Sequence, residues 1–464
     1  MSIKTVLDTG FCIGCGNCAY KAPYTYMMEM DQFGKIIATD IQGANDCEDH
    51  YPRMANICPF SGESLSETEI SKNLFPTPQN EDEKIGRYEA CFGGHVLEGV
   101  YREKGTSGGV SKWLGAELLS LRLIDYFIQV APTDEHSTLF SYKVFSSSDS
   151  LLTGSKACYY PVTLNEVYDF IRNNPGAYAI TAIPCFAKSI RLMQLEDKII
   201  KHRVHFVVGI ICGGLKTANY AKFISMQYPV EPAKMVRIDF RKKTVGASTR
   251  VQATQISYLD QNAEIKEDSR PNTLLKGLDY GMGLFKPKPC DYCDDIVAET
   301  ADISVGDAWL PEFEKDQKGD SVVIVRNKML VSVVEAAMAN HRVSFKRLTS
   351  SDIVTSQAAG FRQRREGLAV RIMNAKSEGM WFPKKRNLGN VSRNVSKRRQ
   401  HIYLLREKIA AESHKIFVLA LESNSIQLFL DWLEPQQEKY RKLNRPGLLQ
   451  RVLKRITKSI FREG

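Results

Sequence analysis

Residues 12–18 read Cys12-Ile13-Gly14-Cys15-Gly16-Asn17-Cys18, which sets three cysteines at a C-x2-C-x2-C spacing. Three thiolates at this spacing wrap a short loop around one face of a metal cluster. The glycines let the backbone approach the cluster and donate N–H groups to its sulfides. Zinc sites also use C-x2-C pairs, so a zinc site is the alternative for this loop.

The positions that lack cysteine favour an iron–sulfur cluster. Bacterial ferredoxins carry two runs of C-x2-C-x2-C-x3-C-P, and the fourth cysteine of each run ligates the other cluster. Here Cys58-Pro59 ends the second run, whereas all four ligand positions of the other cluster hold different residues: Ala22, Glu48, Tyr51 and Met54. We therefore predict a ferredoxin-like domain over residues 1–75. Its single [4Fe–4S] cluster would be held by Cys12, Cys15, Cys18 and Cys58.

The composition indicates a globular protein from a reducing compartment. The chain has 464 residues, enough for two or three domains, of which 43% are hydrophobic and 25% charged. It contains no run of 18 apolar residues, and its first residues lack the apolar stretch of a signal peptide. The cysteine count of 11 is odd, which argues against a secreted disulfide framework. We therefore expect a cytoplasmic protein.

The positive charge is concentrated at one end of the chain. The net charge is +10, yet residues 384–464 alone hold 19 Lys and Arg against 7 Asp and Glu. The rest of the chain is close to neutral. This distribution argues against a nucleic-acid partner and indicates a surface contact made by the C-terminal tail.

The middle of the chain, residues 83–345, alternates helix-like and strand-like patterns and predicts an α/β core. Helices are expected over 110–124 and 165–171, and strands over 126–130, 178–183 and 204–211. Cys185 and Cys212 each follow a predicted buried strand, where open α/β sheets place their sites. Buried structural thiols are the alternative for these two residues. Cys290 and Cys293 form another C-x2-C pair.

Five short motifs follow one another in a recognisable order. They are Thr106-Ser-Gly-Gly-Val110, Gly154-Ser-Lys156, Ala182-Ile-Pro-Cys185, Gly209-Ile-Ile-Cys212, and Cys290-Asp-Tyr-Cys293 running on to Ala301-Asp-Ile-Ser-Val-Gly-Asp307. With the ferredoxin-like module, this order resembles the coenzyme F420 hydrogenase/dehydrogenase beta-subunit family of iron–sulfur flavoproteins over about residues 9–326. The resemblance implies a core that binds FAD. It also implies that Cys185, Cys212, Cys290 and Cys293 ligate a second [4Fe–4S] cluster close to the flavin.

The resemblance further suggests which residues contact the flavin. Ser107, Gly108 and Gly109 precede a predicted helix, and N–H groups at a helix N-terminus suit a phosphate. Gly154, Ser155 and Lys156 would add a hydroxyl and a cation, and the cation would stabilise the anionic reduced flavin. We expect Lys156 and His95 to be catalytic, His95 as a proton donor because histidines exchange protons near neutral pH. An ordinary turn, a solvated lysine and a structural histidine are the alternatives.

Residues 346–464 predict a basic, helical C-terminal extension. One or two helices are expected over 396–433, and a strongly amphipathic helix over 447–461. This last helix suits the surface of an anionic membrane, which would make the protein peripheral at the inner membrane, or it docks on protein. The extension resembles the longer bacterial relatives that are often associated with polysaccharide biosynthesis.

These features together predict an FAD- and [4Fe–4S]-dependent oxidoreductase. Single electrons from a ferredoxin-type or other redox donor would pass through two clusters to FAD, for the two-electron reduction of an organic substrate such as a glycan precursor. The alternative is an electron-transfer subunit that serves a partner enzyme. A zinc-stabilised binding protein is a third interpretation, from another functional class.

Overall fold

The computed structural model describes residues 3–41, 54–133, 138–154, 156–228, 230–244, 251–386 and 395–445. Cys47, Ser155 and the amphipathic helix predicted over 447–461 lie outside the described residues.

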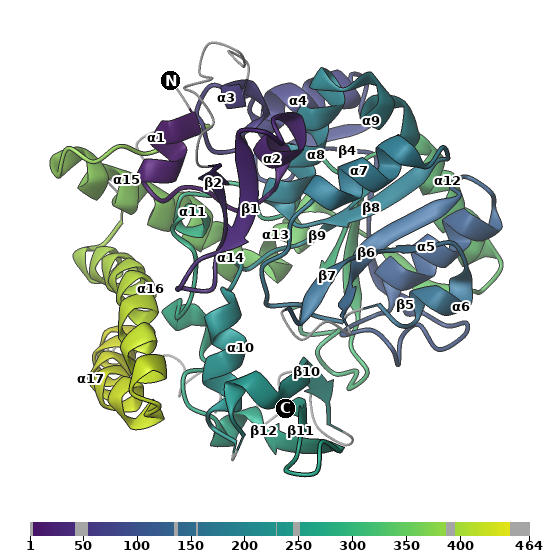
Figure 1. Ribbon diagram of the computed structural model, residues 1–464. Helices are drawn as coiled ribbons and strands as arrows, with labels where there is room; N and C mark the ends of the chain where they lie inside the picture. The colour runs from purple at the N-terminus through teal and green to yellow at the C-terminus, as the bar shows by residue number, and fades with distance from the viewer. Residues whose placement is uncertain are drawn as a thin grey trace, which may run out of the picture.

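An eight-stranded mixed sheet forms the centre of the molecule, with the order β15-β5-β14-β13-β9-β8-β6-β7 (Figure 1). Its strands are β5 (Ala90–Val96), β6 (Tyr126–Pro132), β7 (Phe140–Phe145), β8 (Tyr178–Ala182), β9 (Val204–Ile210), β13 (Ile303–Asp307), β14 (Ser321–Val325) and β15 (Val343–Leu348). The central strands β13, β9, β8 and β6 run parallel, and the outer pairings are antiparallel. The predicted α/β class is confirmed.

Helices cover both faces of this sheet because successive residues of a strand point to opposite sides. On β6, Ile128 belongs to an apolar cluster with residues of α7 (Asn165–Asn173) and α8 (Pro184–Glu196). The adjacent Phe127 belongs to another cluster, with residues of α5 (Val110–Ser120) and α12 (Lys328–Ala339). Two shorter helices, α6 (Ser148–Leu151) and α9 (Lys198–Arg203), complete these layers. The strand ends that carry the cysteines are therefore fixed from both sides.

The N-terminal module packs against α7 and α8. It contains α1 (Ile3–Asp8), α2 (Asn17–Lys21), β1 (Tyr26–Met30), β2 (Ile36–Asp40), α3 (Met54–Ile57) and α4 (Glu67–Leu74), and the small strands β3 (Asn80–Asp82) and β4 (Gly86–Tyr88) follow it. Ala22 and Met54, at two positions where a second ferredoxin cluster would need cysteine, are buried in one apolar cluster. Apolar packing therefore occupies these two positions.

A second, three-stranded antiparallel sheet contains β10 (Met235–Lys243), β11 (Gln252–Leu259) and β12 (Ile265–Pro271). It shares an apolar cluster with α10 (Ala218–Ser225), α16 (Lys397–Glu422) and α17 (Ile426–Asn444). Phe417 of α16 and Phe429 of α17 pack on Phe285, with ring centroids 5.1 and 5.4 Å apart. The C-terminal extension is therefore docked on the core by its apolar side chains.

Short elements connect the sheets and the extension. They are η2 (Pro232–Lys234), η3 (Asn272–Leu274), η4 (Tyr280–Met282), α11 (Lys288–Asp291), α13 (Ser350–Ser356), α14 (Ala358–Arg362), the π-helix η5 (Gln363–Gly367) and α15 (Leu368–Ser377). A helix expected over 110–124 ends earlier, at Ser120, because the chain turns at Arg122, whose φ is 55°. The boundary expected at residue 345 falls inside β15, so the core sheet continues to Leu348.

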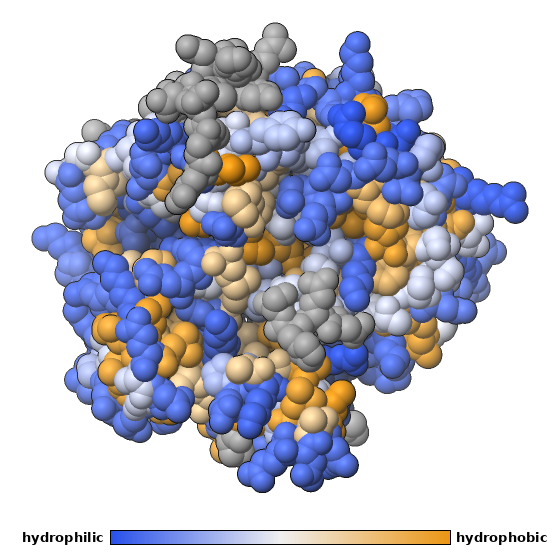
Figure 2. All heavy atoms as spheres, viewed as in Figure 1, coloured by the Kyte–Doolittle hydropathy of each residue, from blue (hydrophilic) through white to orange (hydrophobic). Residues whose placement is uncertain are grey.

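Hydrophilic side chains dominate the face shown in Figure 2, with apolar side chains in smaller groups among them. Some of these groups lie in the lower region, where Figure 1 places α16, α17 and the three-stranded sheet. Within the described part of the chain, no helix combines the length and apolarity that a membrane span requires.

Candidate functional site

The first cysteine quartet converges as the sequence predicts. Cys12, Cys15, Cys18 and Cys58 line one small, mainly apolar pocket beside α1. The loop requires glycine at position 14, where φ is 76° and an added Cβ would lie 2.3 Å from the Ile36 carbonyl oxygen. Burial raises the pKa of Cys15 to about 11. Free thiolates are therefore unfavourable here, and a bound cation or cationic cluster would offset that cost.

The second quartet also converges, although its members are far apart in the sequence. Cys185 lies in the first turn of α8, Cys212 follows β9, and Cys290 and Cys293 lie in and just after α11. Burial, and then the neighbouring sulfurs of the other three cysteines, raise the pKa of Cys185 well above its ordinary value. This arrangement supports the ligand set that the family resemblance implies.

Backbone N–H groups point at two sulfurs of this second quartet. The Gly214 N–H donates to Cys212 Sγ over 3.3 Å, and the Leu215 N–H donates to Cys290 Sγ over 3.4 Å. Hydrogen bonds to ligand sulfurs are among the features that set the potential of an iron–sulfur cluster. The donor set, four neighbouring thiols of which two accept backbone N–H groups, therefore fits a cluster.

The two quartets adjoin each other. The Cys15 sulfur is near enough to contribute to the raised pKa of Cys185, after burial and the other three sulfurs of its own quartet. Asn17, inside the first cysteine loop, contacts Ser189 of α8, the helix that carries Cys185. Asn17 Nδ2 donates to the Ser189 carbonyl oxygen over 3.0 Å, and Ser189 Oγ donates to Asn17 Oδ1 over 2.7 Å.

A cavity of about 1030 Å³ opens beside the second quartet. Cys212 lines its wall, together with residues 105–107 and 109 before α5 and with Lys156. Gly109 adopts a φ of 79°, and an added Cβ would lie 2.6 Å from the Arg102 backbone nitrogen, so the tight turn before α5 requires glycine. The cavity is at the upper end of the volumes typical of ligand sites.

Cationic side chains surround the α5 end of this cavity. Lys156 Nζ lies 3.0 Å from Asp239 Oδ2, and Arg241 Nη1 lies 2.7 Å from Asp307 Oδ2. Lys112 Nζ donates to the carbonyl oxygens of Lys104 and Gly154 over 3.1 and 2.8 Å. Burial, and then Lys156, lower the pKa of Lys112 to about 8. An anionic ligand would stabilise these charges, so the cavity suits a phosphate-bearing cofactor.

Two segments of the chain match a known family. Residues 91–169 match the N-terminal part, and residues 176–351 the C-terminal part, of the coenzyme F420 hydrogenase/dehydrogenase beta subunit. The chain belongs to this family. The matched segments include all four cysteines of the second quartet and the residues 105–109 before α5. Membership in the coenzyme F420 hydrogenase/dehydrogenase beta-subunit family confirms an oxidoreductase or electron-transfer role.

No curated protein matches this chain. Among solved structures, the chain is similar to one in the xenon-derivatised F420-reducing [NiFe] hydrogenase complex from Methanosarcina barkeri. The two chains are 16% identical with a TM-score of 0.48, and the match covers 66% of this chain and 99% of that chain.

In this member of the family, a residue beyond the matched segments reaches the second quartet. Arg364 lies in the π-helix η5 and is buried. Its Nη2 donates to the Cys212 carbonyl oxygen over 2.8 Å, and its Nε to the Asp295 carbonyl oxygen over 2.9 Å. Burial opposes its charge, but the sulfurs of Cys293 and Cys212 raise its pKa above the usual value. The sequence places Arg364 in a basic segment without indicating this contact.

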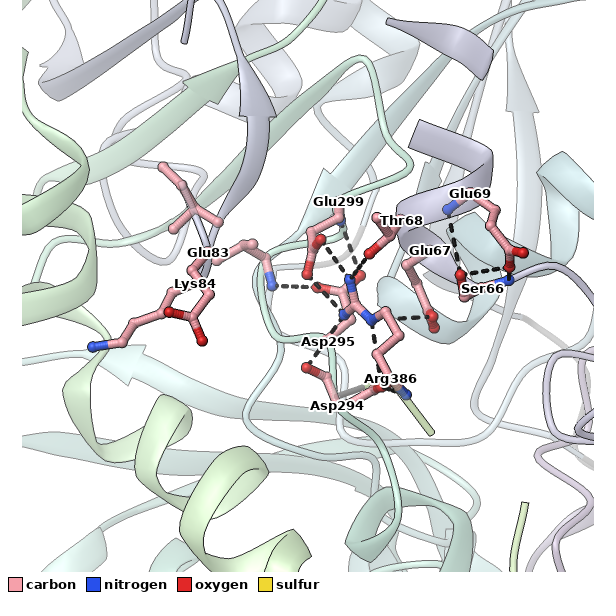
Figure 3. Close-up of polar contacts among 12 residues, drawn as sticks. Ser66, Glu67, Thr68, Glu69, Glu83, Lys84, Asp294, Asp295, Glu299 and Arg386 are labelled. Atoms are coloured by element: carbon pink, nitrogen blue, oxygen red, sulfur yellow. Dashed lines mark hydrogen bonds and ion pairs between the residues drawn. The ribbon is translucent and has the colours of Figure 1, made fainter. Parts of the chain in front are cut away.

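Arg386 holds the loop after Cys293 to the N-terminal module (Figure 3). Its Nη1 and Nη2 bind Glu299 at 2.6 and 2.8 Å, and its Nε lies 3.4 Å from Asp294 Oδ2. The same Nε lies 3.7 Å from Glu67 Oε2 in α4. We expected the basic residues after 384 to make a surface contact. Arg386 instead lies largely buried among carboxylates, because α4 and the loop cover it.

The remaining predicted residues fall into two groups. Ser107, Gly109 and Lys156 line the cavity, whereas Gly108, Gly154 and His95 are not among its described lining residues. Gly108 donates its N–H to Ser321 Oγ over 3.1 Å, and the Gly154 carbonyl accepts from Lys112.

His95 pairs with the carboxylate of Asp320, the residue just before β14. Its Nδ1 lies 2.6 Å from Asp320 Oδ1, and Arg102 contacts both Asp316 and Asp320. His95, Asp316 and Asp320 are close enough to hold a metal ion, but Arg102 already supplies the positive charge. The geometry favours a structural role, and the function of His95 as a proton donor stays a prediction.

Proposed function

We propose that this protein is an iron–sulfur flavoprotein oxidoreductase. Single electrons would pass through two [4Fe–4S] clusters to FAD, for the two-electron reduction of an organic substrate. One observation carries the proposal: the second quartet adjoins both the first quartet and the cavity. Asn17 in the first cysteine loop is hydrogen-bonded to Ser189 of α8, the helix that carries Cys185, and Cys212 lines the cavity wall. This order supports a relay from an outer cluster, through an inner cluster, to a cofactor in the cavity.

The residues around the cavity fit FAD. Residues 105–109 and the first turn of α5 offer backbone N–H groups, and Lys112, Lys156 and Arg241 offer positive charge for its two phosphates. When bound, FAD supplies the exchange between single electrons and a two-electron hydride. The protein contributes the binding and orientation of these groups.

Several finer expectations belong to this proposal. The donor would be a ferredoxin-type or other redox protein that reaches the N-terminal module. A glycan precursor stays the expected substrate, by analogy with the longer bacterial relatives. The alternative is a subunit that feeds electrons to a partner enzyme, and the family's description as a beta subunit favours it. Isolation of the native protein in a stable complex with a catalytic partner would support that alternative.

Anaerobic purification followed by cofactor analysis tests the proposal. We expect about eight iron atoms and about one FAD per chain, with flavin absorption bands above a broad iron–sulfur shoulder. Cys158→Ser is the control for the substitution of a cysteine and should keep its iron, because Cys158 lines the cavity but belongs to neither quartet. Zinc in place of iron, without flavin bands, would contradict the proposal and support the zinc-binding interpretation.

A further inference from the structure

The cavity has a second cationic region, at the end away from α5. Arg406 of α16, Lys216 and Lys286 line it there, together with Tyr280. Figure 1 places α16 and α5 on opposite sides of the molecule, so this end is distinct from the turn assigned to the flavin phosphates. Arg406 lies in the C-terminal extension, beyond the matched family segments, which end at residue 351.

Neutral groups hold Arg406 in place. Its Nη2 donates to Tyr440 Oη over 2.6 Å, and its Nη1 donates to Gln363 Oε1 over 3.2 Å. Its Nε has no hydrogen-bond partner, and no carboxylate lies within ion-pair distance of its guanidinium, among the residues that the structure describes. Arg406 therefore carries a positive charge that the described residues orient but do not neutralise.

Lys216 is also without a carboxylate partner among the described residues. Its Nζ donates to the Leu284 carbonyl oxygen over 2.5 Å and lies 4.6 Å from the centre of the Tyr280 ring. Lys286, by contrast, pairs with Asp291 at 2.5 Å. Burial, and then the nearby Lys286 charge, lower the pKa of Lys216 to about 7, so a bound anion would stabilise its charged form.

The charges of the cavity wall support the same conclusion. The described lining residues include six cations but only two carboxylates. The cations are Lys112, Lys156, Lys216, Arg241, Lys286 and Arg406, and the carboxylates are Asp279 and Asp307. Asp307 pairs with Arg241, and Asp279 accepts the Gly281 N–H over 2.9 Å. Lys156 and Lys286 pair with Asp239 and Asp291, which lie outside the wall. Among the described residues, Lys112, Lys216 and Arg406 therefore remain without a carboxylate partner.

We infer that Arg406 and Lys216 form a substrate subsite for an organic anion, one that presents a carboxylate or a phosphate beside an unsaturated or ring system. Lys216 and the anionic group would interact electrostatically, and Arg406 would add paired hydrogen bonds. The Tyr280 ring would pack against the flat part of the ligand. This inference rests on the proposed function, since it makes the α16 end the place where substrate meets the flavin cavity.

Calorimetric titration of the anaerobically purified protein tests the inference. The probes are benzoate, phenyl phosphate and the neutral analogue benzamide. We expect saturable binding of at least one anion and none of benzamide. Arg406→Gln should weaken anion binding about tenfold or more, because it removes a charge-assisted hydrogen-bond donor. The preferred anion identifies the substrate group as a carboxylate or a phosphate.

Matched variants test whether Arg406 and Lys216 themselves bind the anion. Arg398→Gln changes an exposed arginine of the same helix and should leave binding unchanged. Should Arg406→Gln fail to fold, Lys216→Met serves as the second variant, with the same expected weakening. Equal binding of benzamide, or undiminished anion binding in both variants, would overturn the inference.

Flavin content distinguishes failure of the subsite from failure of the proposed function. Arg406→Gln should keep its FAD, and loss of FAD in that variant would assign Arg406 to the flavin site and overturn the inference. A wild-type protein with iron and flavin that binds neither anion would refute the subsite alone. Absence of iron and flavin from the wild type would refute the proposed function, whatever the anions do.

Discussion

Asn17 and Ser189 exchange two hydrogen bonds across the contact between the N-terminal module and α8. Ser189 Oγ donates to Asn17 Oδ1 over 2.7 Å, and Asn17 Nδ2 donates to the Ser189 carbonyl oxygen over 3.0 Å. Asn17 lies between Cys15 and Cys18, and Ser189 lies one helical turn beyond Cys185. Since electron transfer depends on the separation of two centres, this buried pair fixes the geometry that the proposed relay needs.

Removal of the Asn17 side chain should therefore loosen the contact between the quartets. Asn17→Ala leaves the Ser189 hydroxyl and the Ile57 carbonyl without their partner, and we expect a loss of about 1–3 kcal/mol of stability. Thermal unfolding measures that loss, and electron paramagnetic resonance should show weaker coupling between the two reduced clusters. Asn80→Ala, at an exposed position, is the control. Unchanged stability and coupling would show that Asn17 does not hold the modules together.

The Arg386 cluster offers a separate test of how the extension is attached. Arg386→Met leaves Glu299 buried without its counter-ion, while Asp294 keeps Lys385, and we expect a destabilisation of about 3–5 kcal/mol. Urea unfolding measures it, and Arg386→Lys should recover part of the loss. The exposed pair of Arg347 and Glu335 provides the control, for which we expect less than about 1 kcal/mol from Arg347→Met. A small effect at both arginines would contradict the assigned role.

Lys156 should contribute to flavin binding. We expect Lys156→Met to lower the affinity for FAD about tenfold, since a charge-assisted contact to the cofactor is lost. Equilibrium dialysis of the flavin-depleted protein with FAD measures the change. Asp239→Asn is informative as a control, because it removes the partner of Lys156 and keeps the cation. Equal affinity in Lys156→Met and wild type would place Lys156 outside the flavin contact.

His414 should make stability fall with decreasing pH. It is buried, and its Nε2 lies 3.2 Å from the Lys286 carbonyl oxygen. Burial, and then the nearby Lys35 charge, lower the pKa of His414 to about 3. Between about pH 6 and pH 4, His414 is protonated in the unfolded chain but stays neutral in the folded chain. Stability should therefore decrease by about 1.4 kcal/mol per pH unit from this residue.

Urea unfolding at several pH values checks this prediction. His414→Phe should show a smaller pH slope than wild type over this range, because the titrating group is gone. His205→Phe removes an exposed histidine and should leave the slope unchanged. A slope that is the same in His414→Phe and wild type would contradict the assignment.

The sequence predicts those features of the site that depend on the local spacing of residues along the chain. The C-x2-C-x2-C loop requires only consecutive residues, so its convergence with Cys58 followed from the ferredoxin pattern. The positions of Cys185 and Cys212 followed from apolar runs that end in cysteine, and β8 and β9 end close to the predicted residues. The structure brings these two together with Cys290 and Cys293, as the family order implied.

Contacts made through tertiary packing were not predictable in this way. Arg364, Arg386 and Arg406 read as ordinary basic residues of a charged tail, because side-chain burial leaves no local pattern around an arginine. Their roles arise only when the extension folds back on the core. For the same reason the sequence suggested His95 as a proton donor, although Asp320, just before β14, engages its ring. Charge composition alone therefore misassigned part of the basic extension to the surface.

Anaerobic reduction of wild-type and Cys185→Ser protein by reduced ferredoxin tests the relay most directly, with visible and electron paramagnetic resonance spectra followed together. In the wild type we predict reduction of both clusters and of the flavin. In Cys185→Ser we predict that iron falls to about half, that the cluster on Cys12, Cys15, Cys18 and Cys58 is still reduced, and that the flavin stays oxidised. Flavin reduction at the wild-type rate in Cys185→Ser would contradict the account.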